Sequence, residues 1–386
     1  MTKKKNTKKL VFVGGGHAHL TCLKKLDSFI KRGHAVTVVS SGEYHYYSGM
    51  GPGMLSSIYE PQEIRFHIKK LVESRGGSFI AERVIRIDPK ARTLLLRNGN
   101  EIEYDIASFN TGSEVSGPLL DTSQKKIYPV KPIEKLFIAR CTIIEALKEN
   151  SLHFVVVGGG PAGIEIACNL RKLIYKQNGQ ATITLISGTR ILNSFNPKTR
   201  LLVMEKMGKK EISIVEDAFV NNITNTTITL ENGSSISFDF AFIATGVKPS
   251  SLFKDSGIQS DTDGALLVNE YLQSVQYPQL FGGGDCISFQ PHTLDKVGVY
   301  AIRQNPILLN NLHAALGNGT LKKFIPQKDY LLILNMGDGT GVFFRKSLVC
   351  NGKKAFRLKN YIDTQFTKKF QLFNERDESV ECSDFI

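Results

Sequence analysis

Two glycine-rich loops carry the clearest chemical signal in this sequence. The first contains Gly14 and Gly16, and the second contains Gly158, Gly160 and Gly163. A pyrophosphate requires a backbone that can approach it closely, and a helix N-terminus adds unpaired N–H groups and about half a positive charge. Each loop lies between an apolar run, typical of a buried parallel strand, and a segment with helical character. We therefore expect two dinucleotide sites.

The elements that position these loops occur twice along the chain. The expected strand, helix and second strand span 10–13, 17–31 and 35–39 in the first copy, and 153–157, 162–176 and 181–186 in the second. Each copy also has a later apolar strand that ends in Thr-Gly, after hairpin turns at 98–100 and 232–234. This internal duplication predicts an α/β fold with two Rossmann-like domains.

The two loops differ at their third position. The second loop has Gly163, whereas the first has His19 where a glycine would let helix and strand pack closely. His19 predicts either a slightly opened packing with a side chain near the ligand, or a helix-start residue with local hydrogen bonds. The sequence leaves both readings of His19 and its neighbour His17 open.

The usual ribose-binding acid is missing from the end of both second strands. The first copy ends at Ser40, with Glu43 nearby, and the second ends at Ser187 and is followed by Arg190. A small hydroxyl beside an arginine suits a 2′-phosphate, which makes NADP a hypothesis for the second site.

Composition narrows the class of protein. The chain has 386 residues, 41% of them hydrophobic, and a formal net charge of +13. It contains no apolar run of membrane-spanning length. Its leader, with Lys3, Lys4 and Lys5, is expected to be a solvated tail rather than a signal peptide. The charge favours anionic partners, but no zinc-finger or RNP motif supports nucleic-acid binding.

The six cysteines are widely spaced, with no CxxC pair. This spacing argues against a disulfide framework and against a structural zinc site, and no metal ligands are assigned. A reducing cytoplasm is the expected compartment.

Several motifs resemble those of the two-dinucleotide-domain flavoproteins, which include type II NAD(P)H:quinone oxidoreductases and sulfide:quinone oxidoreductases. The motifs span 14–19 (GGGHAH), 47–53 (YSGMGPG), 281–285 (FGGGD), 296–304 (KVGVYAIRQ) and 357–363 (RLKNYID). Within this superfamily the chain looks closest to the flavoprotein module that is fused, in some organisms, to selenide, water dikinase. The kinase part of that fusion is absent.

The resemblance implies a glutathione-reductase-type arrangement with FAD in the first copy and a nicotinamide nucleotide in the second. The implied domains are 1–118 and 247–325 for FAD, 119–246 for NAD(P), and a small C-terminal α+β segment at 326–386. The expected FAD-binding residues are Gly14, Gly16, His17, Ala18, Ser40, Pro52, Gly53, Thr111, Gly112, Gly284, Asp285 and Tyr300. The expected NAD(P)-binding residues are Gly158, Gly160, Gly163, Ser187, Arg190, Thr245 and Gly246.

The same resemblance implies hydride transfer from NAD(P)H to flavin and electron transfer to a quinone-like acceptor. Glu165 is expected near the nicotinamide side. Lys296, Tyr300, Arg303 and Gln304 fall at helical spacing and would face the flavin, or else form a solvated basic face. Glu165, Lys296 and Gln304 are the catalytic candidates.

Two other functions stay open. Sulfide oxidation would need a cysteine pair across the flavin, for which only Cys141 and Cys350 are candidates, and the sequence pairs neither. A flavin-binding redox-regulatory module with little turnover is the other alternative, which the missing ribose acids support.

A C-terminal apolar stripe suggests a docking surface. Ile362, Phe366, Phe370 and Phe373 recur at near-helical spacing within an expected helix over 356–373. The stripe could rest on an anionic membrane face, with the protein peripheral to the inner side of the cell membrane. Alternatively, it packs on the FAD domain or forms a homodimer interface.

Overall fold

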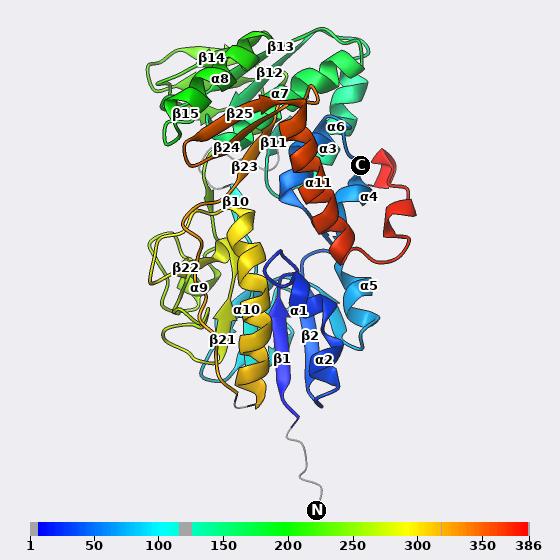
Figure 1. Cartoon of the computed structure of the whole chain (residues 1–386), viewed down its shortest axis with the longest axis vertical. Helices are drawn as coiled ribbons and strands as arrows, with labels where there is room; N and C mark the ends of the chain where they lie inside the picture. The colour runs from blue at the N-terminus through cyan, green and yellow to red at the C-terminus, as the bar shows by residue number, and fades with distance from the viewer. Residues whose placement is uncertain (1–6, 116–125, 318, 385–386) are drawn as a thin grey trace, which may run out of the picture.

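The computed structural model describes residues 7–115, 126–317 and 319–384. Within them, two five-stranded parallel sheets lie one above the other, with the C-terminal segment against them (Figure 1). The leader lysines 3–5 and the expected domain boundary at 118/119 lie outside the described residues.

The lower sheet in Figure 1 has the order β21-β9-β1-β2-β5. Its strands are β1 (Lys9–Val13), β2 (Ala35–Ser40), β5 (Ser78–Ala81), β9 (Ile106–Phe109) and β21 (Leu280–Gly282). Most central positions are buried apolar residues, as expected for parallel strands covered on both faces. Because β21 comes from a distant part of the chain, this domain is assembled from two separate segments.

The upper sheet has the order β11-β18-β12-β13-β14. Its strands are β11 (Ile127–Pro129), β12 (Leu152–Val157), β13 (Ala181–Ile186), β14 (Ile212–Val215) and β18 (Phe240–Ile243). The order β9-β1-β2-β5 is thus repeated as β18-β12-β13-β14, which confirms the predicted duplication.

Each sheet carries an antiparallel three-stranded hairpin unit. These units are β6 (Val84–Asp88), β7 (Thr93–Leu96) and β8 (Glu101–Glu103), and β15 (Val220–Ile223), β16 (Thr227–Leu230) and β17 (Ser235–Ser237). The predicted turns at 98–100 and 232–234 connect their last two strands.

Helices cover the sheets and connect the domains. They are α1 (Leu20–Lys24), α2 (Asp27–Ile30), α3 (Gly51–Leu55), α4 (Pro61–Ile64), α5 (Ile68–Glu73), α6 (Glu134–Ala146), α7 (Pro161–Lys176), α8 (Pro197–Gly208), α9 (Leu252–Asp255), α10 (Gly298–Gly317) and α11 (Lys353–Phe370). Short 3-10 turns lie at Ser48–Met50, Gly284–Cys286, Glu375–Asp377 and Cys382–Asp384. Among the described residues, no helix has the length and apolar character needed to cross a membrane.

The remaining strands form small ribbons. β3 (Tyr44–Tyr46) pairs with β4 (Arg65–His67), β10 (Glu114–Val115) with β19 (Val247–Lys248), and β20 (Leu266–Val268) with β22 (Ile287–Phe289). β23 (Leu332–Asn335), β24 (Gly341–Arg345) and β25 (Leu348–Gly352) form a C-terminal sheet. β10 precedes and β19 follows the segment that forms the upper sheet. Their pairing therefore joins the two chain connections between the lower and upper domains.

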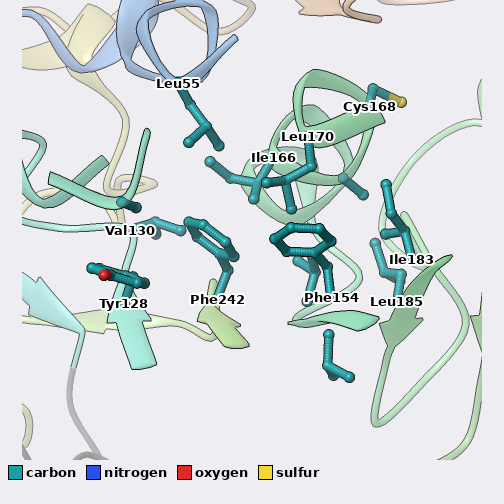
Figure 2. Packing of buried hydrophobic residues seen from close by; sticks show 14 of the residues in the cluster. Leu55, Tyr128, Val130, Phe154, Ile166, Cys168, Leu170, Ile183, Leu185 and Phe242 are labelled. Carbon is teal, nitrogen blue, oxygen red and sulfur yellow. The ribbon is translucent and has the colours of Figure 1, made fainter. Parts of the chain in front are cut away.

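Apolar packing fixes α7 against the upper sheet. Phe154 and Phe242 extend from neighbouring strands toward Ile166 and Leu170 on this helix (Figure 2). All four side chains are at most 1% exposed. This burial holds the N-terminus of α7 in place behind the second glycine loop.

The expected helix over 17–31 is shorter and divided. Residues 17–19 form a turn, closed by the amide of His19 donating to Gly16 O at 2.9 Å. α1 then ends at Lys24, and α2 begins at Asp27. The turn and the buried His19 side chain delay the first helix, which explains the difference from the prediction.

The C-terminal stripe packs inside the molecule over only part of its length, since Ile362 is 41% exposed. Phe366 contacts the rings of Tyr47 and Phe66, and Phe370 is 4% exposed. Phe373, by contrast, is 95% exposed. The alternative of packing on the first domain therefore holds for Phe366 and Phe370.

The expectation of unpaired cysteines is wrong for one pair. Cys141 on α6 forms a disulfide with Cys382 in the C-terminal tail, across a sequence separation of 241. Sequence spacing could not show this pair, because only the folded tail brings Cys382 to α6.

Candidate dinucleotide-binding sites

The first cavity opens at the carboxyl ends of β1, β2 and β9. Its lining combines the first glycine loop with several segments that are distant along the chain. Lining residues include Gly14, Gly15, Gly16, His17, Ser40, Ser41, Tyr44, His45, Ser48, Glu82, Thr111, Gly112, Ser113, Lys131, Gly284, Asp285, Gly298 and Ala301. This is the position at which open α/β sheets bind nucleotides.

Side chains on the first loop would collide with its support. A Cβ on Gly14 would lie 2.3 Å from Asn110 O, and one on Gly16 would lie 2.2 Å from Asn110 Oδ1. Gly14 also has φ +87°, which L side chains rarely adopt. The loop therefore needs both glycines, and it leaves backbone exposed to a ligand as a pyrophosphate site requires.

Asn110 holds this loop to the rest of the domain. Its Oδ1 accepts from the amide of Ala18 at 3.0 Å, and its Nδ2 donates to Gly283 O at 2.6 Å. The residue is 5% exposed. One amide thus connects the first glycine loop to the segment that returns from the far end of the chain.

His19 is a structural residue of the core. Its Nδ1 lies 2.7 Å from Gly14 O and its Nε2 lies 2.9 Å from Ser108 Oγ. Because a carbonyl only accepts, Nδ1 carries the proton and Nε2 accepts from the hydroxyl. Burial lowers the pKa of His19 to about 4, so the ring is neutral at pH 7. The reading with local hydrogen bonds is therefore correct.

A pair of histidines, the buried His17 and the partly exposed His45, lies at the cavity. His17 and His45 both line it, and His45 Nε2 lies 3.1 Å from His17 Nδ1. Burial, followed by the charge of Lys131, lowers the pKa of His17 to about 3. Neutral imidazoles at this position suit an uncharged ring system better than a phosphate.

Asp285, another residue that lines the first cavity, forms an ion pair. Its carboxylate accepts from Lys131 Nζ at 2.8 Å and from Ser113 Oγ at 2.7 Å. Burial opposes ionisation, but Lys131 and Ser113 hold the pKa of Asp285 below its ordinary value. Lys296 Nζ donates to Asp285 O at 3.0 Å, so this predicted catalytic residue supports the loop.

The second cavity has the same relation to the upper sheet. Its lining includes Val157, Gly158, Gly159, Gly160, Pro161, Ile186, Ser187, Gly188, Thr189, Arg190, Leu192, Asn193, Ser194, Phe195, Ala218, Phe219, Val220, Thr245 and Gly246. A Cβ on Gly158 would lie 2.4 Å from Ala244 O, and one on Gly163 would lie 1.9 Å from Gly158 O. α7, with 16 residues, begins directly behind this loop.

A buried charged network joins α7 to α11. Glu165 Oε1 accepts from the amide of Asn335 at 2.7 Å, and Lys359 Nζ donates to Asp363 at 2.8 Å. Tyr47 donates to the other oxygen of Asp363 at 3.0 Å. Burial raises the pKa of Glu165 to about 7, although the charge of Lys359 opposes the rise. Despite burial, Asp363 and Glu165 raise the pKa of Lys359.

Most of the predicted binding residues line one cavity or the other. Those at the first cavity are Gly14, Gly16, His17, Ser40, Thr111, Gly112, Gly284 and Asp285. Those at the second are Gly158, Gly160, Ser187, Arg190, Thr245 and Gly246.

The other predicted residues are not among those described as lining the two cavities. Ala18 and Gly163 support the loops, and Gln304 Oε1 accepts from the amide of Gly284 at 2.7 Å. Tyr300 donates to Gln327 O at 3.4 Å. Pro52 and Gly53 are buried in α3, where a Cβ on Gly53 would meet Tyr59 at 2.6 Å. Glu165 belongs to the network above.

Sequence reasoning missed Asn110, Lys131 and His45. A polar side chain at the end of an apolar strand was the available signal for Asn110, because a buried amide needs partners. No comparable signal marks Lys131 or His45, since each is brought to the cavity by an element distant in sequence.

The chain matches a protein-family model. Residues 8–305 match the family described as pyridine nucleotide-disulphide oxidoreductase. Among curated proteins, it is 25% identical to ferroptosis suppressor protein 1 of Taeniopygia guttata, covering 86% of this chain and 88% of that protein. It is 23% identical to the external alternative NAD(P)H-ubiquinone oxidoreductase B1 of Solanum tuberosum, covering 74% of this chain but only 56% of that enzyme.

Solved structures share the fold. The sulfide:quinone oxidoreductase of Aquifex aeolicus superposes with a TM-score of 0.79 at 18% identity, over 95% of this chain and 92% of that one. The NDH2 of Plasmodium falciparum in complex with NADH gives 0.78 at 15% identity, over 94% and 98%. The two glycine cradles and cavities fit FAD and NAD(P)H. The chain belongs to the pyridine nucleotide-disulphide oxidoreductase family.

Proposed function

We propose that this protein is an FAD-dependent NAD(P)H dehydrogenase that passes electrons to a quinone-like acceptor. The observation that carries the proposal is the pair of duplicated glycine cradles, each opening into its own cavity in one chain. Two dinucleotide sites in a single protein suit transfer between a nicotinamide donor and a flavin. The quinone oxidoreductases among its relatives support the choice of acceptor.

The residues at hand would bind and orient both cofactors. Gly14 and Gly16 would hold the FAD pyrophosphate, with Asp285 as a hydrogen-bond acceptor in the same cavity. Gly158 and Gly160, behind which α7 begins, would hold the NAD(P)H pyrophosphate. When bound, the flavin would accept a hydride from the nicotinamide and release two electrons to the acceptor.

Proton handling would fall to the buried network. The pKa of Glu165 is raised to about 7, so this carboxyl can hold or release a proton at neutral pH. Lys359 and Asp363 lie in the same network, and Tyr47 connects it to the wall of aromatic rings around His17. Glu165 is thus the chain's candidate for proton exchange through this network.

The absence of a thiol favours quinone reduction over sulfide oxidation. Among the described residues that line the first cavity, none is a cysteine. Cys22, Cys168 and Cys286 are buried free thiols, and Cys141 is paired with Cys382. The other candidate, Cys350, is an exposed free thiol on β25 and is not among the residues that line this cavity. Burial raises the pKa of Cys286, which disfavours its thiolate. A cysteine-based relay across the flavin therefore has no support at this cavity.

Finer properties complete the proposal. They are the domain limits predicted from sequence, a location in the cytoplasm, peripheral contact with an anionic membrane and a homodimer. The Cys141–Cys382 disulfide removes the argument for this location that rested on unpaired cysteines. Kinship with the module fused to selenide, water dikinase rests on the sequence motifs alone. The exposed Phe373, close to Lys368 and Lys369, supports membrane contact.

The absorption spectrum of the purified protein, recorded without oxygen, tests the proposal. We expect a flavin spectrum that bleaches with NADPH or NADH and recovers when a soluble quinone analogue is added. Bleaching by sulfide instead would support the sulfide:quinone alternative. A flavin spectrum that neither nucleotide bleaches would support the redox-regulatory alternative, and no flavin after reconstitution with FAD would refute the proposal.

A further inference from the structure

The second cavity lacks the carboxylate that recognises the unphosphorylated ribose. Dinucleotide domains usually hold the ribose hydroxyls with an acid at the end of the second strand. Here β13 ends at Ile186 and is followed by Ser187, Gly188 and Thr189. Among the described residues that line this cavity, Arg190 is the one charged side chain.

One carboxylate at the end of the neighbouring strand, that of Glu216, is already occupied. Glu216 follows β14, the strand beside β13, and both of its oxygens accept from Arg200 Nη2, at 2.9 and 2.6 Å. Glu216 Oε1 also accepts from the amide of Ile191 at 2.6 Å. Although burial opposes ionisation, these partners lower the pKa of Glu216. Because Arg200 compensates the charge of Glu216, this carboxylate neither binds a ribose nor repels a phosphate strongly.

The segment that presents Arg190 is anchored on both sides. The amide of Ser187 donates to Val215 O at 2.8 Å, and the amide of Leu192 donates to Gly159 O at 2.9 Å. The bond from Ile191 to Glu216 fixes the residue directly after Arg190. The guanidinium therefore extends from a fixed backbone, which reduces the entropy lost when it binds a ligand.

Two hydroxyl residues, Ser187 and Thr189, line the cavity together with Arg190, and Thr189 Oγ1 donates to Arg190 O at 3.4 Å. Ser187 is 4% exposed, and a Cβ on Gly159 would lie 2.1 Å from its Oγ, so this hydroxyl lies directly on the glycine loop. Thr189 and Arg190 are exposed at the rim. Hydroxyl donors beside a planar guanidinium match the oxygens of a phosphate monoester.

We propose that the second site selects NADPH over NADH, with Arg190 recognising the 2′-phosphate and Ser187 and Thr189 donating to it. This inference rests on the proposed function, because it assumes that the second cavity holds the nicotinamide nucleotide. Glu216 is a positioning residue that holds the segment and keeps Arg200 away from the ligand.

Calorimetric binding of two adenosine fragments tests the recognition without turnover. Adenosine 2′,5′-bisphosphate and adenosine 5′-monophosphate differ only in the 2′-phosphate. We expect the FAD-loaded protein to bind the bisphosphate about tenfold or more tightly, as charge-assisted hydrogen bonds would give. R190Q should remove most of this advantage and leave the affinity for the monophosphate unchanged.

Two further variants separate this contact from general charge. K198Q removes an exposed positive charge in the same domain, outside the cavity, and should leave both affinities unchanged. T189D places a carboxylate beside Arg190 and should weaken binding of the bisphosphate selectively.

The outcomes distinguish the inference from the proposed function. Equal affinity for the two fragments, together with flavin bleaching by both nucleotides, would overturn the NADPH preference and leave the proposed function intact. An equal loss of bisphosphate affinity in K198Q and R190Q would also overturn it, because the effect would then be one of general charge. No fragment binding and no bleaching by either nucleotide would refute the proposed function itself.

Discussion

The first and second glycine loops make corresponding backbone hydrogen bonds, but other contacts that stabilise them differ. The amide of Gly14 donates to Val39 O at 2.7 Å, and the amide of Gly158 donates to Ile186 O at 2.8 Å. The residues after β9 and β18 also correspond, since the amide of Asn110 donates to Val13 O at 2.8 Å and the amide of Ala244 donates to Val157 O at 2.7 Å. Two loops of one shape thus occupy corresponding positions in two domains.

Their third positions hold this shape by different means. Gly163 lies so close to Gly158 O that a Cβ would be 1.9 Å away, whereas His19 reaches Gly14 O through its imidazole at 2.7 Å. One loop depends on close backbone packing, and the other depends on a buried side chain. A position that departs from the glycine pattern therefore need not lose the loop.

The helices behind the loops differ as a consequence. α7 begins at Pro161 and runs for 16 residues, but α1 begins at Leu20 and has 5. A longer, regular helix presents more dipole at its N-terminus. We infer that the first site relies more on individual groups, such as the Asn110-supported loop and Asp285, than the second site does.

The largest expected effect is that of H19A. The substitution leaves a cavity and takes the partner from Gly14 O and Ser108, so we expect a loss of about 3–4 kcal/mol of unfolding free energy. FAD should dissociate more readily, while the second site is preserved. Denaturant unfolding and retention of flavin during gel filtration measure this.

The control for H19A is H292A, which removes an exposed histidine. It should change stability by no more than about 0.5 kcal/mol. If H19A retains both flavin and stability, the imidazole does not hold the first loop, and the comparison fails at that loop.

G163A should have a smaller effect, confined to the second loop. The added methyl group would meet backbone at Gly158, which has no flexible atom to yield, and overpacking of this kind costs about 1–3 kcal/mol. Flavin content should stay normal while nucleotide-fragment binding is lost.

G208A provides a matched glycine control, because nothing lies within 4 Å of a Cβ at the end of α8. It should be neutral or slightly stabilising. Loss of flavin in G163A would show that the two loops are not independent and would contradict the comparison.

The smallest expected effect is the pH response of E165Q. Glu165 has no titratable counterpart in the first copy. It lies two residues after Gly163, whereas the residue two positions after His19 is Thr21. Because the folded pKa of about 7 exceeds that of an unfolded glutamate, the native state binds the extra proton. The stability from Glu165 is therefore complete below the unfolded pKa and is lost as pH rises through 7.

In E165Q the side-chain amide oxygen can still accept from the amide of Asn335. The substitution removes the loss of stability that ionisation of Glu165 causes at high pH. Allowing for partial access of water, the unfolding free energy of E165Q should exceed that of the wild type by about 1–2 kcal/mol at pH 8 and by much less at pH 5.5. Denaturant midpoints at the two pH values measure the difference. A stability difference that is the same at both would contradict the assigned pKa shift.

Local patterns were sufficient for much of the fold and the site. The apolar runs before each glycine loop, the Thr-Gly strand ends and the hairpin turns predicted two Rossmann-like domains, and strand order in both sheets confirms the duplication. Fourteen predicted residues line the two cavities, namely Gly14, Gly16, His17, Ser40, Thr111, Gly112, Gly284, Asp285, Gly158, Gly160, Ser187, Arg190, Thr245 and Gly246. Such residues lie next to strand ends, so their place follows from local sequence.

The sequence by itself determined the two glycine loops, because a tight turn at a strand end requires glycine whatever surrounds it. Only the tertiary structure decided contacts between distant segments. It brought Lys131 to Asp285, Cys382 to Cys141, and Glu165 into a network with Lys359 and Asp363. Those contacts depend on how whole domains pack against each other, and the local pattern of residues along the chain does not predict that packing.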